Sequence, residues 1–192
     1  MSQLDQLFQD IKANGYQDIS SLNDLMRIDK RHRDLISVIL SYIDQVDDVR
    51  DKETLIRSLG VKGFSEAVEP LIEEFRSNEC DFCKWAIGNT LSIIKDKESI
   101  PELIQLASQR EHGHSRQMIV VALGQMKAEE ALPVLIDLLD DETVAGHAVS
   151  ALSYFAKPEL IPHLEPFTSH EKTWIRNEAK KAIKKLKKLR DN

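Results

Sequence analysis

Residues 122–139 read ALGQMKAEEALPVLIDLL and hold two short apolar stripes separated by a charged turn. In the first stripe Ile119, Leu123 and Met126 are three or four residues apart, the spacing of one side of an α-helix. The second stripe begins after the segment KAEE, and Pro133 stands near its start, where a missing backbone N–H costs little. The stretch therefore predicts a hairpin of two short helices.

The same pattern occurs four times along the chain. A leucine is followed ten or eleven residues later by a proline in the pairs Leu59/Pro70, Leu91/Pro101, Leu123/Pro133 and Leu152/Pro162. Successive leucines are 32, 32 and 29 residues apart, and a half-unit at Ala182-Ile183 follows without its proline. Helices this short are unstable alone, so each must bury its stripe against a neighbour. A repeat of this length predicts a stack of helical hairpins.

These residues resemble the HEAT-like repeats first noted in the phycobilisome lyase family, over about residues 47–189. The resemblance implies an all-α, armadillo-like helical fold. Its expected form is a right-handed α-α superhelix, a HEAT-like solenoid of stacked antiparallel helix pairs. Activity does not follow from this resemblance, because many unrelated scaffolds share the repeat.

The chain is expected to form one continuous solenoid with two parts. Residues 1–46 hold an N-terminal cap helix, Leu4–Ala13, closed by Asn14-Gly15, and a degenerate first repeat. In that repeat Ser20 or Ser21 caps a short helix, and residues 33–43 form another. Residues 47–192 hold four HEAT-like repeats and a basic C-terminal capping helix, residues 176–189.

Charge is divided unevenly along the chain. The net charge is −6, but residues 172–192 carry +7 and the remainder carries −13. The body therefore repels nucleic acid and anionic membranes, whereas the tail attracts them. The N-terminus lacks the pattern of a signal peptide, and no apolar run approaches the ~18–20 residues needed to span a bilayer. Two cysteines form no disulfide framework, so a reducing cytoplasm is the expected location.

A column of charges recurs where the first helix of each repeat begins. Its basic positions are Lys52, Lys84, Arg116 and Arg176, with Ala145 in the fourth unit, and each is preceded five residues earlier by an acid. These acids are Asp47, Glu79, Glu111, Asp140 and Glu171. The column is interpreted as structural: each acid caps a helix start or pairs with a base, and so sets the geometry of the repeat.

The second helices carry a polar, mainly acidic stripe at positions −3, +1 and +4 from the proline. The candidate partner-binding residues on it are Glu74, Glu98, Glu102, Gln105, Glu130, Asp137, Glu159 and His163. The resemblance places second helices on the concave surface of the solenoid. Two interpretations remain open: a solvated face without a role, or an acidic groove that receives a basic segment of another protein. Trp85 joins the candidates because its column is otherwise polar, and exposed Trp is enriched at interfaces.

No residue is predicted to be catalytic, to bind a metal or to bind a cofactor. Cys80 and Cys83 have C-x-x-C spacing but no second ligand pair, although His112 and His114 lie one repeat later. We interpret them as two small buried thiols. Deoxyhypusine hydroxylase, a HEAT-like enzyme, binds iron through several His-Glu pairs, whereas only His170-Glu171 occurs here.

The sequence thus predicts a monomeric, non-catalytic scaffold or adaptor that binds another protein on an acidic concave face. One version is an immunity-type or inhibitor protein that neutralises a basic partner. The alternative class is an enzyme or lyase-type subunit, nearer to a phycobilin lyase than to a DNA glycosylase. A third candidate is contact with nucleic acid or a membrane through Lys180, Lys181, Lys184, Lys185, Lys187, Lys188 and Arg190.

Overall fold

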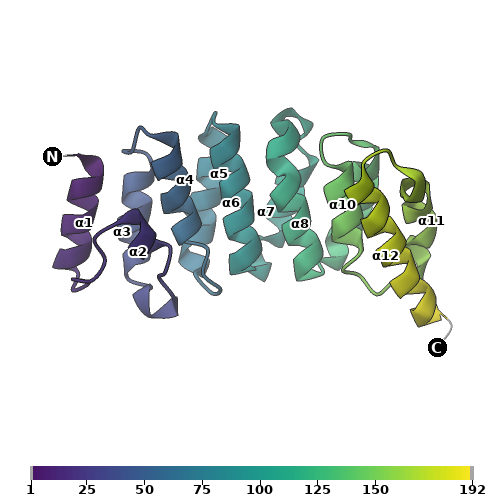
Figure 1. The fold of residues 1–192 in the computed structure, drawn as a ribbon, viewed down its shortest axis with the longest axis horizontal. Helices are drawn as coiled ribbons and strands as arrows, with labels where there is room; N and C mark the ends of the chain where they lie inside the picture. The colour runs from purple at the N-terminus through teal and green to yellow at the C-terminus, as the bar shows by residue number, and fades with distance from the viewer. Residues whose placement is uncertain (1, 191–192) are drawn as a thin grey trace. The chain divides into compact units, whose positions relative to one another are not determined.

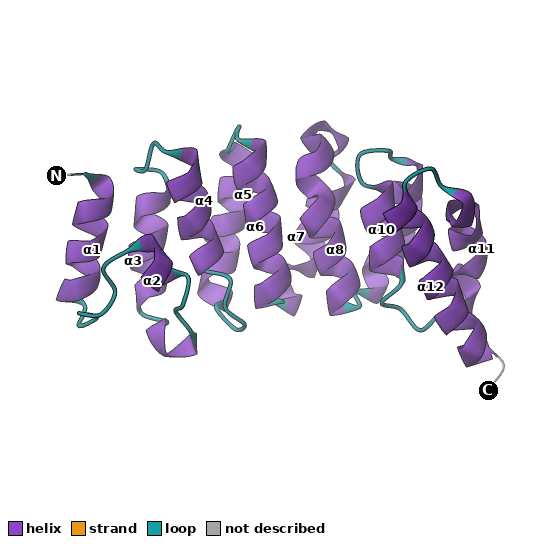
Figure 2. Cartoon of the chain, in the orientation of Figure 1, coloured by secondary structure: helices purple, strands orange, loops and turns teal. Residues whose placement is uncertain are grey.

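The structure of the protein is a computed structural model that describes residues 2–190, with the side chain of Arg190 outside the described part. Within this range every regular element is a helix and no strand occurs (Figure 2). The chain has an all-α superhelical repeat fold, which confirms the predicted fold class. None of the described helices is both long and apolar enough to cross a membrane.

The chain divides into two compact units, residues 1–99 and residues 100–192. Each unit is described by itself. Unit 1 contains α1 (Gln3–Ala13), α2 (Leu22–Leu25), α3 (Leu35–Ile43), α4 (Val49–Ser58), α5 (Val68–Ser77) and α6 (Asp81–Ile94), with 3-10 turns at Lys30–His32, Ser65–Ala67 and Lys97–Ser99. Helix α3 lies between α1 and α4, and α6 lies beside α4 (Figure 1).

Capping side chains and a glycine mark the ends of α1 and α2, as the sequence predicts, whereas the start of α3 differs. The Ser2 side chain accepts a hydrogen bond from the N–H of Asp5 at the start of α1, and Gly15 follows its end with φ of 98°. Ser21 rather than Ser20 caps α2. Helix α3 begins at Leu35, two residues later than predicted, because residues 30–32 first form a 3-10 turn capped by Asp29.

In unit 2 second helices alternate with first helices, and one more helix follows at the end. The second helices are α7 (Ile100–Ser108), α9 (Leu132–Asp137) and α11 (Ile161–Leu164), the first helices are α8 (Gln117–Met126) and α10 (Ala145–Leu152), and the last helix is α12 (Thr173–Arg190). Between them lie 3-10 segments at Arg110–Arg116, Glu129–Ala131, Leu138–Asp140, Pro158–Leu160 and Glu165–Ser169. The first helices α8 and α10 lie side by side, and α12 packs next to α10 (Figure 1).

The prolines stand where the sequence predicts, at the second residue of α7, α9 and α11. The last of these helices is only four residues long. Pro166, two residues after its end, has no N–H to continue the helical bonding, so the chain goes on as a 3-10 segment, residues 165–169.

The core of unit 2 lies between first and second helices. Four leucines of the second helices, Leu103, Leu106, Leu135 and Leu164, are fully buried. Helices α8 and α10 approach so closely that a Cβ on Gly124 would lie 2.4 Å from the Cα of Ala151.

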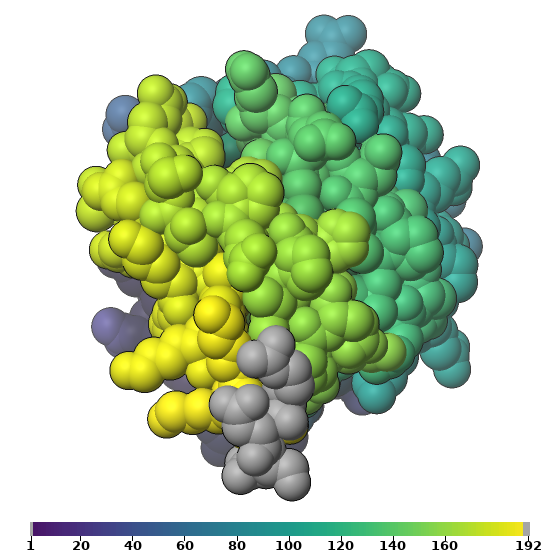
Figure 3. Space-filling view, turned by 90° about the vertical axis from the view of Figure 1, so that its right-hand side faces the viewer, coloured from purple at the N-terminus to yellow at the C-terminus, as the bar shows by residue number. Residues whose placement is uncertain are grey.

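Helix α12 closes unit 2 with an apolar side turned inward. Ile175, Ala179, Ala182, Ile183 and Leu186 are buried, while its lysines are exposed. In the space-filling view, yellow-green and yellow atoms of the residues after about 150 form the left and lower part of the face that is seen, beside green atoms of earlier residues (Figure 3). The closing role predicted for residues 176–189 belongs to a helix that begins three residues earlier, at Thr173.

Candidate partner-binding surface

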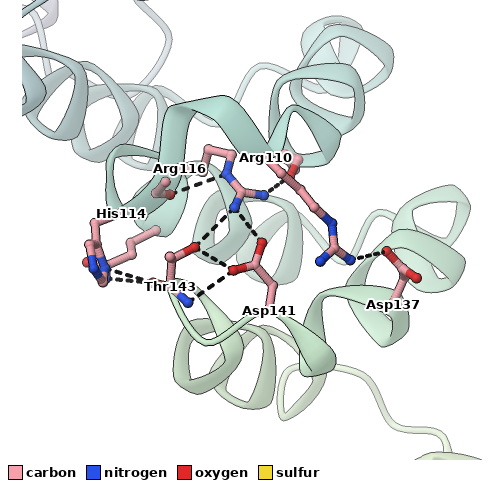
Figure 4. A network of polar contacts seen from close by, with 9 residues as sticks. Arg110, His114, Arg116, Asp137, Asp141 and Thr143 are labelled. Carbon is pink, nitrogen blue, oxygen red and sulfur yellow. Dashed lines mark hydrogen bonds and ion pairs between the residues drawn. The ribbon is translucent and has the colours of Figure 1, made fainter.

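Arg116 is the centre of a buried polar network that fixes the geometry of unit 2 (Figure 4). Its side chain is fully buried and lies 2.6 Å from both the carbonyl oxygen of Ala107 and the carboxylate of Asp141. It also donates hydrogen bonds to the carbonyl oxygen of Gly113 and to the hydroxyl of Thr143. The guanidinium thus ties the end of α7 to the turn before α10.

Asp141 completes this network from the next repeat. One carboxylate oxygen accepts hydrogen bonds from the N–H and the hydroxyl of Thr143. Burial alone would raise the pKa of Asp141, but the bonds from Thr143 and Arg116 outweigh burial and hold the pKa below its ordinary value. The pair is therefore charged at neutral pH.

Acid should weaken the fold through Asp141. Its pKa is lower in the folded state, so its contribution is complete above the unfolded value of 3.8 and is lost as the pH falls through the folded value. We expect the free energy of unfolding to drop below about pH 4 by more in the parent protein than in Asp141→Asn. Urea titrations at a series of pH values measure the difference, and parallel pH profiles for the two proteins would contradict the assignment.

In two of the five units the acid that makes the contact lies one residue after the predicted column. Asp47, Glu79, Glu111, Asp140 and Glu171 are all exposed, and Arg116 pairs with the following residue, Asp141. In the same way Asp48, not Asp47, caps α4 by accepting from the N–H groups of Arg50 and Asp51. The residue directly before the helix, in extended conformation, can turn its side chain back to the free N–H groups.

The candidate residues of unit 2 lie on the exposed side of its second helices and of the turns that precede them. We call Glu102, Gln105, Glu130, Asp137, Glu159 and His163 the acidic second-helix surface, and all six are exposed. They alternate with the buried leucines, so the apolar stripe of each helix faces the core and the polar stripe faces solvent.

Two ion pairs join neighbouring second-helix segments of unit 2 at this surface. Arg110 lies 3.1 Å from the carboxylate of Asp137, and Lys157 lies 2.5 Å from that of Glu129. The charge of Asp137 is thus partly compensated, whereas Glu130 and Glu159 form no ion pair within residues 2–190.

The electrostatic contrast within unit 2 is large. Its second-helix segments, residues 100–112, 127–142 and 156–172, contain eleven acidic and four basic residues. Helices α8 and α10 contain no Asp, Glu, Lys or Arg at all. The acidic residues of this unit are therefore concentrated in the segments that carry the acidic second-helix surface, and most of its basic residues lie in α12.

Three candidate residues lie in unit 1 and differ in environment. Glu98 is exposed in the turn Lys97–Ser99. Glu74 of α5 is half-buried and its side chain accepts a hydrogen bond from Asn78. Burial, together with the nearby carboxyl of Asp44, raises the pKa of Glu74 above its ordinary value. Because Glu74 is half-buried and Glu98 is exposed, a cation of a partner would reach the Glu98 carboxylate more easily.

Trp85 is half-buried, on a first helix rather than a second one. The guanidinium of Arg57 on α4 lies over its ring, 5.3 Å from the ring centroid, and Arg57 is held by Glu53. These contacts account for Trp85 as part of the packing of α6 against α4, with a cation–π contribution.

Trp174 is a surface aromatic residue that the sequence analysis missed. Its side chain is 49% exposed and contacts the edge of His147, with 5.4 Å between ring centroids. A Cβ on Gly146 would lie 2.3 Å from its ring, so glycine makes room for the indole. The sequence holds a sign of this contact, because Gly146 stands at the repeat position that Trp85 occupies in α6. The other units have larger side chains there, Glu53, Gln117 and Asn177.

The lysines of α12 line a shallow groove beside the 3-10 segment Glu165–Ser169. Thr168 and Ile183 lie in it together with Lys180, Lys184, Lys187 and Lys188. On another side of the helix, Lys185 donates to the carbonyl oxygen of Ser153. The basic helix α12 therefore packs on the rest of unit 2 through its apolar side.

The two cysteines differ from the predicted pair of buried thiols. Cys83 is fully buried, but Cys80 is only half-buried and is the N-cap of α6. Among residues 2–190 no three His, Cys, Asp or Glu side chains are grouped so as to hold a metal ion. His112 and His114 belong to unit 2, apart from the unit that contains both thiols.

Comparisons with known proteins agree with this fold. A family model described as HEAT repeats matches residues 68–145. Among solved structures, the designed armadillo repeat protein YIII(Dq)4CqI is similar with a TM-score of 0.53 and 19% identity, over 95% of this chain and 99% of that one. A search of the curated proteins finds no match. The family match is limited to residues 68–145, the structural match supports the helical repeat fold, and neither match is to a phycobilisome lyase.

Proposed function

We propose that the chain is a non-catalytic binding module that takes up a basic segment of another protein on the acidic second-helix surface. HEAT and armadillo repeats are commonly scaffolds for protein interactions, which agrees with the general claim. The observation that carries the specific claim is that all six polar positions on the second helices and the turns before them are exposed, while Leu103, Leu106, Leu135 and Leu164 are buried.

The surface suits a cationic segment for electrostatic reasons. Carboxylates repeated along neighbouring helices attract lysine and arginine, speed the encounter and exclude acidic competitors. The basic residues already present there, Arg110 and Lys157, are each paired with an acid. Glu130 and Glu159 are exposed carboxylates that a partner can reach, although Lys157 also acts electrostatically on Glu159.

Further parts of the proposal rest on the sequence alone. The module is expected to act as a monomer in the cytoplasm, with residues 1–46 as its N-terminal cap and first repeat. An immunity-type or inhibitor protein that covers a basic partner is one form of this function. Action as a lyase-type subunit is the alternative, and no described residue has been assigned to such chemistry.

Charge reversal on the acidic second-helix surface should weaken binding. A library of displayed random peptides selected on the parent protein should return sequences with an excess of Lys and Arg. The double variant Glu130→Lys/Glu159→Lys is expected to bind the selected peptide about tenfold more weakly, since exposed ion pairs contribute ~0.2–1 kcal/mol each and reversal adds repulsion. Fluorescence polarisation at a fixed, low salt concentration measures the two affinities.

A matched control separates local from general charge effects. The double variant Asp18→Lys/Asp47→Lys changes two exposed acids of unit 1 and alters the net charge equally. It should bind the same peptide within about twofold of the parent. Selected peptides without a basic excess, or equal weakening by both variants, would count against the proposal.

A further inference from the structure

The C-x-x-C pair at the start of α6 has the geometry of a reactive dithiol. Cys80 is the N-cap of this 14-residue helix, and its sulfur accepts a hydrogen bond from the N–H of Cys83 at 3.4 Å. Cys80 is half-exposed to solvent, whereas Cys83 is fully buried. One thiol can thus be reached from outside, and the other lies behind it.

The environment gives the two sulfurs different roles. The Cys80 sulfur lies at the N-terminal end of α6, where it accepts the N–H of Cys83 and is partly exposed. Burial, together with a hydrogen bond with the Cys80 thiol, raises the pKa of Cys83 to about 12. Cys83 therefore stays a protonated thiol until its neighbour is oxidised.

We propose that Cys80 and Cys83 form a thiol–disulfide exchange site. The Cys80 thiolate attacks a disulfide R–S–S–R, forming a mixed disulfide at residue 80 and releasing one thiolate R–S⁻. Cys83 then loses its proton to a released thiolate and attacks the Cys80 sulfur, which expels the second R–S⁻. In total the two protein thiols lose two electrons and two protons to form one disulfide, and R–S–S–R becomes two R–SH.

The surroundings of the site indicate which disulfides react best. In the sequence Phe82 stands between the two cysteines. Its side chain is 74% exposed and provides an apolar surface close to Cys80. Glu79 precedes Cys80 and is exposed, and its carboxylate disfavours an anionic reactant. The substrate class is therefore a disulfide with neutral or cationic substituents, such as one beside basic residues in a protein.

The order of attack can be tested by mass spectrometry of the full chain. Incubated with cystamine, a cationic disulfide, the parent protein should lose the mass of two hydrogens. The variant Cys83→Ser should stop at one cysteamine adduct on residue 80, and Cys80→Ser should stay unmodified. Cystamine should also react about threefold or more faster than the anionic oxidised glutathione at low salt.

Several results would overturn the proposal. One is a parent protein whose two cysteines are both still alkylated by iodoacetamide after the cystamine treatment. Another is an adduct on Cys83 of Cys80→Ser at the rate seen for Cys80. Faster reaction with oxidised glutathione would contradict the substrate class. The parent measurement needs no substitution, and circular dichroism checks that each variant is folded.

Discussion

Replacing Arg116 with methionine is expected to lower the free energy of unfolding by about 3–5 kcal/mol, the usual cost of breaking a buried ion pair from one side. Arg116 is fully buried, and its removal leaves the Asp141 carboxylate and the carbonyl oxygen of Ala107 without their 2.6 Å partner. Methionine fills much of the volume but donates no hydrogen bond. Urea denaturation followed by circular dichroism measures the loss.

The control for Arg116 lies on the same 3-10 segment. Arg110 pairs with Asp137 at 3.1 Å, but its side chain is 55% exposed. Arg110→Met should therefore change stability by less than about 1 kcal/mol. If the two substitutions cost the same, the buried network does not hold unit 2 together as described.

Replacing Gly124 with valine is expected to lower the free energy of unfolding by about 3 kcal/mol through overpacking. The new Cβ would lie 2.4 Å from the Cα and 2.6 Å from the carbonyl oxygen of Ala151. Both of these are backbone atoms of α10, so relief requires the two helices to move apart. Thermal and urea denaturation measure the effect.

A neighbouring substitution controls for the helix propensity of valine. Gln125 is the next residue of α8 and is half-buried, so Gln125→Val introduces the same branched side chain without a backbone contact. It should cost less than about 1 kcal/mol. Equal losses for the two variants would mean that α8 and α10 are not in close contact at Gly124.

The repeat pattern was sufficient to predict the fold, because it consists of residues with strong preferences for particular positions in a helix. Pro133 and Pro162 mark the starts of second helices, and Ser21 marks the start of α2. The alternation of buried and exposed positions in the second helices also follows from helical periodicity. For that reason the exposure of Glu102 and Asp137 could be predicted from the sequence.

The contacts between repeats could not be predicted in the same way. Arg116 reaches Asp141 rather than Asp140 because Asp140 still belongs to the 3-10 segment Leu138–Asp140 and is exposed, whereas Asp141 is extended and buried. That choice depends on the conformation of a turn, and the repeat that follows is 29 residues long instead of 32. A one-residue shift of this kind leaves no trace in the hydrophobic pattern.

The role of Cys80 illustrates a second limit. Its column position correctly indicated that Cys83 is buried, since Val144 and Ile175 share that column and are buried as well. Cys80 stands just before the helix, where exposure depends on capping geometry rather than on periodicity. The difference between the two thiols therefore became visible only in the structure.

The most direct test of the proposed function is a nuclear magnetic resonance titration of the ¹⁵N-labelled protein with the selected basic peptide. The account predicts that the largest shift changes lie in α7, α9, α11 and the turns before α9 and α11, around Glu102, Glu130 and Glu159, and that they disappear in Glu130→Lys/Glu159→Lys. Changes centred instead on the lysines of α12, or on the first helices α8 and α10, would contradict it.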